Sequence, residues 1–208
     1  MLQEVYRGDA ELIAFYIEAL DGGNYEVRFD EAEFKPENNG PLNGGFGNAI
    51  LVRTDGRLDI ELEGVAFSEQ LPHDGDEGRS VTGYELSVDG HEVTVLNTHL
   101  SAEGAEVRRP QIERVLELAA SVDGAVIVAG DFNARPNEIE GIRSDEPQDG
   151  LVDSFAEVGT GTGRTGGLGY GGRIDYVWAS DIEPEEAWVV DAGSSDHAGV
   201  VVDFQLAG

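Results

Sequence analysis

Apolar residues recur along the chain with two spacings, and each spacing predicts one type of element. A stripe at helical spacing predicts a helix over residues 10–20, which Asp9 can cap. The stripe consists of Leu12, Ile13, Tyr16, Ile17 and Leu20. The same spacing predicts a second helix from about Glu103 to Val122. Its inward-facing residues are Val107, Ile112, Val115, Leu116 and Ala119.

Runs of strand length account for most of the other apolar positions. Met1, Leu2 and Val5 look like the end of a buried strand. Further strands are predicted at residues 25–30, 47–53, 58–64, 80–88, 91–100, 125–133, 173–180, 186–192 and 198–206. Asp89-Gly90, between two of these runs, is a strong hairpin signal. Many strands in hairpin order with two strong helices predict an α/β protein with packed mixed sheets and helices outside.

The composition is typical of one folded domain, but the charge is extreme. The 208 residues carry 42 Asp and Glu against 13 Lys and Arg, a formal net charge of -29. The apolar residues make up 40% of the chain and are periodic, which argues against a disordered acidic segment. So much like charge destabilises a fold unless salt screens it, and at molar ionic strength the Debye length is ~3 Å. The acidity therefore predicts adaptation to a salty cytoplasm.

Two absences in the sequence narrow the class of protein further. The chain has no cysteine, which excludes a disulfide framework and a thiolate metal site. It has no signal-peptide pattern and no apolar run long enough to span a membrane. We therefore expect a cytoplasmic protein with no membrane association and no obligate protein partner.

Polar side chains interrupt the buried runs where strands begin or end. They are Glu4, His99, Asp131, Asn133, Asp175, Asp196 and His197. Each has an ordinary explanation by itself, as a turn, a cap or a satisfied histidine. Together they form an oxygen-rich set at strand ends, where a rigid scaffold presents catalytic groups. Such donors suit Mg²⁺ or Mn²⁺, and zinc fits less well because the histidines have no short ligand spacing.

Five short motifs in a fixed order carry a resemblance to a known family. "LQE", "NTHL", "GDFN", "RIDYVW" and "SDHAGVV" resemble motifs of the endonuclease/exonuclease/phosphatase superfamily, whose fold is that of deoxyribonuclease I. The resemblance runs from residue 2 to about residue 204. It implies a four-layer sandwich of two mixed, mostly antiparallel sheets face to face, with helices outside. It also implies hydrolysis of phosphodiesters or phosphomonoesters with a divalent metal, usually Mg²⁺.

The resemblance also implies roles for the residues at the metal and at the attacking water. Glu4 would bind the metal, and Asp196 would lie near the metal or its waters. Asp131 would orient and deprotonate the attacking water, and Asn133 would hold that water or a phosphoryl oxygen.

Further roles concern the phosphoryl group of the substrate. His197, oriented by Asp175, would donate to a phosphoryl oxygen as negative charge builds. His99 would be a second phosphate contact or the general acid for the leaving group. Arg79 and Arg109 are candidate phosphate contacts, although scattered arginines are more often surface residues. The glycine-rich segment 159–172 would either border the substrate cleft or be a surface loop.

The substrate and the N-terminus stay open at this stage. A phosphodiester, either nucleic acid or a small molecule, is favoured over a lipid or sugar phosphomonoester, and a non-catalytic relative that binds a phosphorylated ligand or a protein is the third alternative. In the family, "LQE" ends the second strand. We therefore expect residues 1–208 to form a single domain that lacks the first strand, with a start codon assigned too far downstream. Reading the coding frame upstream of Met1 tests this expectation.

Overall fold

The computed structural model describes residues 1–33, 45–72, 78–143, 150–166, 171–191, 193 and 195–206. Its strands are β1 (Leu2–Tyr6), β2 (Tyr25–Glu33), β3 (Phe46–Arg53), β4 (Ile60–Gln70), β5 (Ser80–Val88), β6 (His91–His99), β7 (Ala125–Asp131), β8 (Val152–Asp153), β9 (Asp175–Ser180), β10 (Glu183–Val190) and β11 (Gly199–Gln205). Its helices are α1 (Arg7–Asp21), α2 (Ala105–Ala120), α3 (Pro136–Arg143) and α4 (Ser154–Val158). Residues 167–170 of the glycine-rich segment are among those that lie outside the described residues.

The strands form one large sheet and two small ones. The large sheet has the order β4-β5-β6-β7-β9-β8, and the small sheets are β1-β3-β2 and β10-β11. Strands β6 and β7 are parallel and joined by α2, whereas the other paired strands run antiparallel. The small sheets pack on the large one, because β1 and β3 contact β6 and β11 contacts β9.

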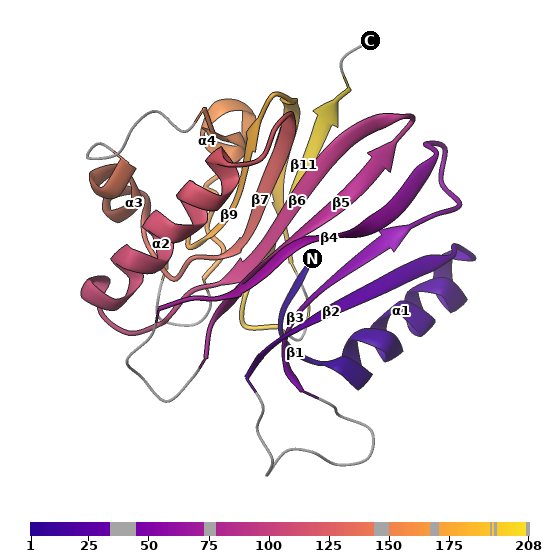
Figure 1. Cartoon of the computed structure of the whole chain (residues 1–208), viewed down its shortest axis with the longest axis horizontal. Coiled ribbons are helices and arrows are strands. Elements are labelled where there is room, and N and C mark those ends of the chain that lie inside the picture. Colours follow the sequence, from indigo (N-terminus) through magenta and orange to yellow (C-terminus); the bar gives the residue numbers. More distant parts are fainter. Residues whose placement is uncertain are drawn as a thin grey trace.

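The helices lie outside the sheets. Helix α1 packs beside β2 and β3, and α2 and α3 lie across the large sheet from it (Figure 1). The layers are therefore α1, the small sheets, the large sheet, and α2 with α3. The predicted four-layer α/β sandwich of mixed, mostly antiparallel sheets is confirmed, with one of its two β layers divided into two sheets.

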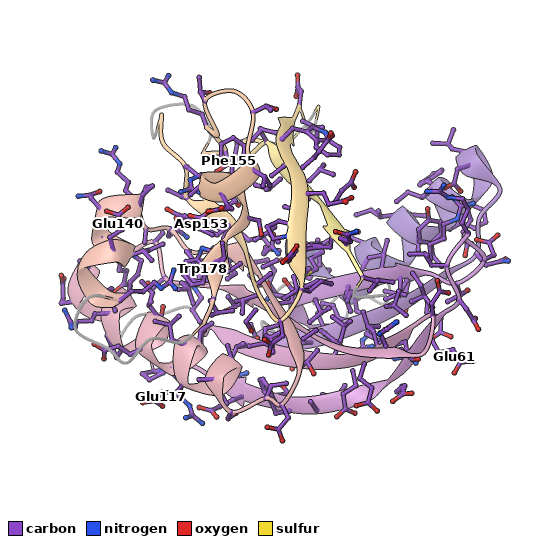
Figure 2. All side chains as sticks on the ribbon, turned by 90° about the horizontal axis from the view of Figure 1, so that it is seen from above. Glu61, Glu117, Glu140, Asp153, Phe155 and Trp178 are labelled. Atoms are coloured by element: carbon purple, nitrogen blue, oxygen red, sulfur yellow. The ribbon has the colours of Figure 1, made fainter. Side chains whose placement is uncertain are left out.

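Two apolar clusters fill the spaces between these layers. One lies between the two β layers and includes Ile50 of β3 and Val95 of β6. The other lies between the large sheet and α2 with α3, where Phe132, Tyr176 and Trp178 pack with ring centroids 4.5 to 5.6 Å apart. Figure 2 shows Trp178 inside the molecule. Because Phe132 is fully buried in this cluster, the chain on either side of it is held in a fixed place.

The hairpin at Asp89-Gly90 is confirmed. Asp89 has φ 50° and Gly90 has φ 80°, and Val88 pairs with His91 across the turn. Positive φ at both central residues is the type I′ geometry that matches the twist of paired strands. The sequence signal was therefore sufficient to fix both the turn and the register of β5 and β6.

The details predicted for the first helix were wrong. Helix α1 begins at Arg7, directly after β1, and Asp9 lies in its first turn instead of capping it. The apolar stripe of the predicted helix is largely exposed, with Leu12 at 49% and Leu20 at 87%. The helix buries Ala10 and Ala14 instead, because small side chains let its backbone approach the sheet closely.

Two short helices were not predicted from the sequence, although each carries a local signal. Helix α3 begins with Pro136, and proline is favoured at the first helical position. Helix α4 begins after Asp153, whose carboxylate accepts a hydrogen bond from the backbone N–H of Ala156 at 3.1 Å. Among the described helices, none has both the length and the apolar character that a bilayer crossing requires.

Candidate active site

The centre of the candidate site lies where three neighbouring strands bring polar residues to one edge of the large sheet. His99 ends β6, Asp131 ends β7 and Asp175 begins β9. The register pairs His99 with Asp131 in the parallel direction and Asp131 with Asp175 in the antiparallel direction. Parallel strands end at the same edge of a sheet, and an antiparallel neighbour begins there. The three side chains are therefore neighbours although 76 residues separate the first from the last.

Gly130 makes this arrangement possible. It has φ 158°, and a Cβ atom added to it would lie 1.9 Å from the backbone oxygen of Thr98. The close approach of β6 and β7 at this point therefore requires a residue without a side chain. This is the physical reason for glycine directly before the aspartate in "GDFN".

A tight turn after β7 places Asn133 beside Asp131. The Asp131 carboxylate accepts a hydrogen bond from the backbone N–H of Asn133 at 2.7 Å, and Asn133 has φ 47°. Asparagine tolerates this left-handed conformation better than most residues. The amide nitrogen of Asn133 donates to the backbone oxygen of Leu100 at 3.0 Å and lies 3.1 Å from Nε2 of His99. Asp131 and Asn133 are thus fixed by local hydrogen bonds before any ligand is considered.

His197 approaches this edge from the segment before β11. Its Nδ1 lies 2.9 Å from Oδ2 of Asp175 and 3.8 Å from Oδ2 of Asp131. A carboxylate accepts a hydrogen bond, so the proton of the neutral ring is held on Nδ1 and Nε2 is left to face a ligand. The predicted orientation of His197 by Asp175 is present in this geometry.

Arg79, which precedes β5, is buried against His99. Its Nη1 lies 2.9 Å from Nδ1 and 3.4 Å from Nε2 of the imidazole. A donor in line with one ring nitrogen would lie much farther from the other, so the guanidinium sits over the ring face. Nε2 of His99 is then free to accept from the Asn133 amide, and the ring proton belongs on Nδ1, which lies 3.8 Å from Oε1 of Glu4.

The two histidines are in opposite electrostatic environments. Burial, the positive charge of Arg79 and that of His197 lower the pKa of His99 to about 3. Burial alone would lower the pKa of His197 too, but the charge and hydrogen bond of Asp175, with Asp131 and Asp196, raise it above its ordinary value. At neutral pH His99 is therefore an uncharged ring. Of the two roles predicted for His99, a contact fits this state and an imidazolium acid does not.

The carboxylates crowd one another. Burial, the negative charge of Asp175 and that of Glu4 raise the pKa of Asp131 to about 7, against the opposing effects of the Asn133 N–H and His197. Burial raises the pKa of Asp175 as well. Buried carboxylates with further carboxylates beside them form a local concentration of negative charge that a cation would neutralise.

Several of these groups could hold a metal ion. Asp131, Asp175 and His197 offer ligand atoms that lie within 4.8 Å of one another. The hydrogen bond between Asp175 and His197 already occupies two of these atoms. The exposed carboxylates of Glu4 and Asp196 are the additional oxygen donors at the rim, since each influences the pKa of a residue in the cluster. Oxygen donors of this kind fit the preferences of Mg²⁺ and Mn²⁺.

The structure separates the two arginines that the sequence could not distinguish. Arg79 is 5% exposed and contacts His99, whereas Arg109 lies on the exposed side of α2 and pairs with Glu113 one turn along the helix at 2.7 Å. The structure therefore brings Arg79 to the site and does not bring Arg109 there. Its neighbour Arg108 is the buried one, and it joins α2 to Glu138 of α3.

Sequence reasoning missed several residues that support the site. Asn97 accepts from the side-chain nitrogen of Gln3 at 2.8 Å and donates to the backbone oxygen of Ala49 at 3.1 Å, which holds β1 and Glu4 over the large sheet. Thr165 is 2% exposed and contacts the backbone of Asp175. Gln3 and Asn97 stand inside "LQE" and "NTHL", so the motifs did mark them. Thr165 stands in the glycine-rich segment, where no local signal distinguishes it from its neighbours.

Comparison with known proteins gives one family and one fold. Residues 1–197 match the model of the Endonuclease/Exonuclease/phosphatase family. None of the curated proteins matches the chain.

Three solved structures illustrate the similarity of fold. An endonuclease/exonuclease/phosphatase from Bacteroides vulgatus has a TM-score of 0.74 and 16% identity, over 99% of this chain and 83% of its own. A mannosyl-6-phosphatase from Bacteroides thetaiotaomicron has a TM-score of 0.72 and 19% identity, over 98% and 84%. TDP2 of D. rerio, complexed with a single-strand DNA product, has a TM-score of 0.69 and 17% identity, over 99% and 84%.

Proposed function

The chain belongs to the endonuclease/exonuclease/phosphatase family, and from that membership we propose that it hydrolyses a phosphate ester by direct attack of water, with Mg²⁺ or Mn²⁺ as cofactor. The observation that carries the proposal is the position of the Asp131 carboxylate. Its Oδ2 lies 3.6 Å from Nε2 of His99 and 3.8 Å from Nδ1 of His197. A buried carboxylate between two imidazoles, with its pKa raised toward neutrality, is suited to accept a proton from water.

Asp131 and Asn133 handle the attacking water in this proposal. The carboxylate accepts the proton of the water, and the amide of Asn133 holds the water or a phosphoryl oxygen. Both side chains are fixed by the turn after β7, so little reorganisation is needed when the substrate binds. Phosphoryl transfer depends mainly on such positioning and on charge stabilisation.

His197 stabilises the negative charge that develops on the phosphoryl group. Asp175 holds its Nδ1 proton and keeps the ring charged over a wider pH range, which leaves Nε2 to donate toward a phosphoryl oxygen. On the other side of Asp131, the neutral His99 and the cation of Arg79 form a second contact surface for the phosphate.

The metal would be held by Glu4 and Asp196, next to the carboxylate of Asp131. When bound, a divalent cation supplies neutralisation of the phosphate charge and polarisation of a phosphoryl oxygen. Burial raises the pKa of Asp131 first, and the negative charges of Asp175 and Glu4 raise it further; this concentration of negative charge is the feature of this chain that fits a cation. Glu4 is set for this role by its strand geometry, since its φ of 55° turns the backbone at a bulge and its side chain remains exposed.

A phosphodiester is the favoured substrate, and a phosphomonoester is the second candidate. The similar structures include both a sugar phosphatase and an enzyme captured with a single-strand DNA product, so they support either class. The chain has no cysteine to act as a nucleophile, and the proposed role of Asp131 in accepting a proton from water suits one-step hydrolysis of either ester.

Hydrolysis of bis(p-nitrophenyl) phosphate and of p-nitrophenyl phosphate, each in molar KCl with Mg²⁺, Mn²⁺ or EDTA, tests the proposal. We expect metal-dependent hydrolysis that Asp131→Asn lowers by about 10²-fold or more, as for loss of a general base. Asp123→Asn, an exposed aspartate at the other end of β7, is the matched control and should keep full activity.

The outcomes separate the alternatives. The ratio of the two rates chooses between a diesterase and a monoesterase. Equal activity in the Asp131→Asn and Asp123→Asn variants would contradict the assignment of Asp131. Complete inactivity on both esters, with no change of melting temperature on metal addition, would favour a relative that only binds a phosphorylated ligand or a protein.

A further inference from the structure

One residue of the glycine-rich segment, Thr165, has a buried polar side chain beside the candidate site. Thr165 is 2% exposed, and its Oγ1 accepts hydrogen bonds from two consecutive backbone groups, the N–H of Ile174 and the N–H of Asp175, both at 3.1 Å. These are the groups at the start of β9, where the Asp175 side chain is aimed at His197. The hydroxyl therefore fixes the backbone from which Asp175 projects.

The backbone of the same residue reaches the histidine side of the pair. Ala198, directly after His197, donates its N–H to the backbone oxygen of Thr165 at 2.9 Å. Thr165 also donates its own N–H to the backbone oxygen of Gly172 at 3.1 Å, which closes the segment on itself. One residue thus links the chain at Asp175 with the chain at His197.

The glycines explain how a threonine arrives at this place. Gly163 has φ 63°, and a Cβ atom added to it would lie 2.5 Å from the ring of Phe155, a residue of α4 that is labelled in Figure 2. The segment can pass over Phe155 at this point only because Gly163 lacks a side chain. The structure therefore uses the glycine-rich segment to place Thr165, and this is a more specific role than either a cleft border or a surface loop.

The Thr165 hydroxyl also acts on the carboxylate of Asp175. Burial raises the pKa of that carboxyl, and the Thr165 hydroxyl and His197 both oppose the rise. The two backbone hydrogen bonds that Thr165 accepts fix the main chain from which the Asp175 side chain projects, which limits the positions that its carboxylate can adopt. The rotamer of Asp175 in turn sets which nitrogen of His197 carries the proton.

We propose that Thr165 is a positioning residue for hydrolysis: it holds Asp175 and, through Asp175 and Ala198, fixes the tautomer and orientation of His197. The kinetic consequence rests on the proposed function, whereas the structural consequence does not. Residues that orient a catalytic histidine through a carboxylate are known to matter nearly as much as the histidine itself.

Three variants test the proposal. Thr165→Val removes the hydroxyl at nearly constant volume, and Thr165→Ser restores it. Thr162→Val makes the same change at an exposed threonine of the same segment and is the matched control. The readouts are kcat and KM for bis(p-nitrophenyl) phosphate, and the tautomer of His197 from its ring ¹⁵N chemical shifts at a pH where the ring is neutral.

We expect Thr165→Val to lower kcat by about 10- to 100-fold, with KM changed less than threefold, because the group that binds substrate is present but misaligned. The fraction of His197 protonated on Nδ1 should fall in the same variant. Thr165→Ser should restore both quantities to near the wild-type values, and Thr162→Val should change neither.

Results that would overturn the positioning role of Thr165 can be told apart from a failure of the proposed function. An unchanged tautomer or an unchanged kcat in Thr165→Val overturns the positioning role. So does a loss that Thr165→Ser does not restore, because it would indicate a general folding defect. If the wild-type protein hydrolyses neither ester, the proposed function fails, and the tautomer comparison still decides whether Thr165 orients His197.

Discussion

At the scale of single residues, the two histidines of the site have pKa values shifted in opposite directions by their surroundings. His99 and His197 both lie close to Asp131, yet the pKa of His99 is lowered to about 3 whereas that of His197 is raised. The difference arises because a buried ring under the cation of Arg79 cannot accept a proton easily, while a ring beside two carboxylates can. The site therefore contains one neutral and one readily charged imidazole.

The raised pKa of Asp131 predicts how stability depends on pH in the metal-free protein. The pKa is about 7 in the folded state against 3.8 for an ordinary aspartate, so between these values the folded state binds a proton that the unfolded state releases. Asp131 therefore contributes a fall in the free energy of unfolding as pH rises from about 4 to about 7. His99, whose pKa is lowered to about 3, contributes a rise over the lower part of that range, so the contribution of Asp131 is read from the difference between wild type and a variant. The raised pKa of His197 adds a loss of the same sign, as pH rises through its folded-state value.

Denaturant unfolding in molar KCl with EDTA, at a series of pH values, measures this dependence. Relative to wild type, Asp131→Asn should lose the fall in stability between about pH 4 and pH 7, and Asp123→Asn should match wild type because that side chain is exposed. A slope that survives intact in Asp131→Asn would assign the effect to other carboxylates.

At the scale of elements, the parallel pair β6 and β7 decides whether the site forms. Both strands end at the same edge, and α2 connects them across the outer face of the sheet. The pairing brings together the "NTHL" and "GDFN" motifs, and β9 adds "RIDYVW" from the other side. Gly130 of β7 lies unusually close to the backbone of Thr98 in β6.

Gly130→Ala should therefore be strongly destabilising. The new Cβ would meet a backbone oxygen that cannot move without breaking the β6–β7 pairing, so we expect a loss of at least about 2–3 kcal/mol in the free energy of unfolding. Gly141→Ala is the matched control, since an added Cβ has nothing within 4 Å and the residue lies in α3. There alanine should stabilise by about 0.5–1 kcal/mol. Denaturant unfolding of the two variants checks both signs, and similar effects would contradict the close-approach argument.

At the scale of the whole molecule, the negative charge lies on the surface. Glu61, Glu117 and Glu140 are exposed and point away from the body of the protein in Figure 2. Many of the described arginines are already paired with carboxylates, among them Arg53, Arg108, Arg114 and Arg173. The remaining carboxylates account for the net charge of -29, and those on the surface repel one another. Dissolved ions screen this repulsion.

The melting temperature should therefore rise steeply with KCl from about 0.05 M to above 1 M, as the Debye length shortens from about 14 Å to about 3 Å. The double variant Glu61→Gln/Glu140→Gln should melt above wild type at low salt and coincide with it in molar KCl. Scanning calorimetry in a KCl series measures both trends. A wild-type melting temperature independent of salt would contradict the expected adaptation to a salty cytoplasm.

The sequence by itself determined the features that depend on local pattern. Alternation and apolar runs identified most strands, Asp89-Gly90 fixed a hairpin, and the ordered motifs identified the family and the polar residues of the site. These signals are readable because a strand must alternate, a tight turn must accept positive φ, and catalytic groups must stand at strand ends.

The tertiary structure decided whatever depends on contacts between distant segments. It placed Arg79 on His99 and left Arg109 on the surface, although the two arginines are equivalent as sequence. It exposed the apolar stripe of α1, because packing against the sheet selected Ala10 and Ala14. It also joined Thr165 to Asp175 and to the chain at His197, which no local pattern indicates, since hydrogen bonds between distant segments depend on the fold that brings them together.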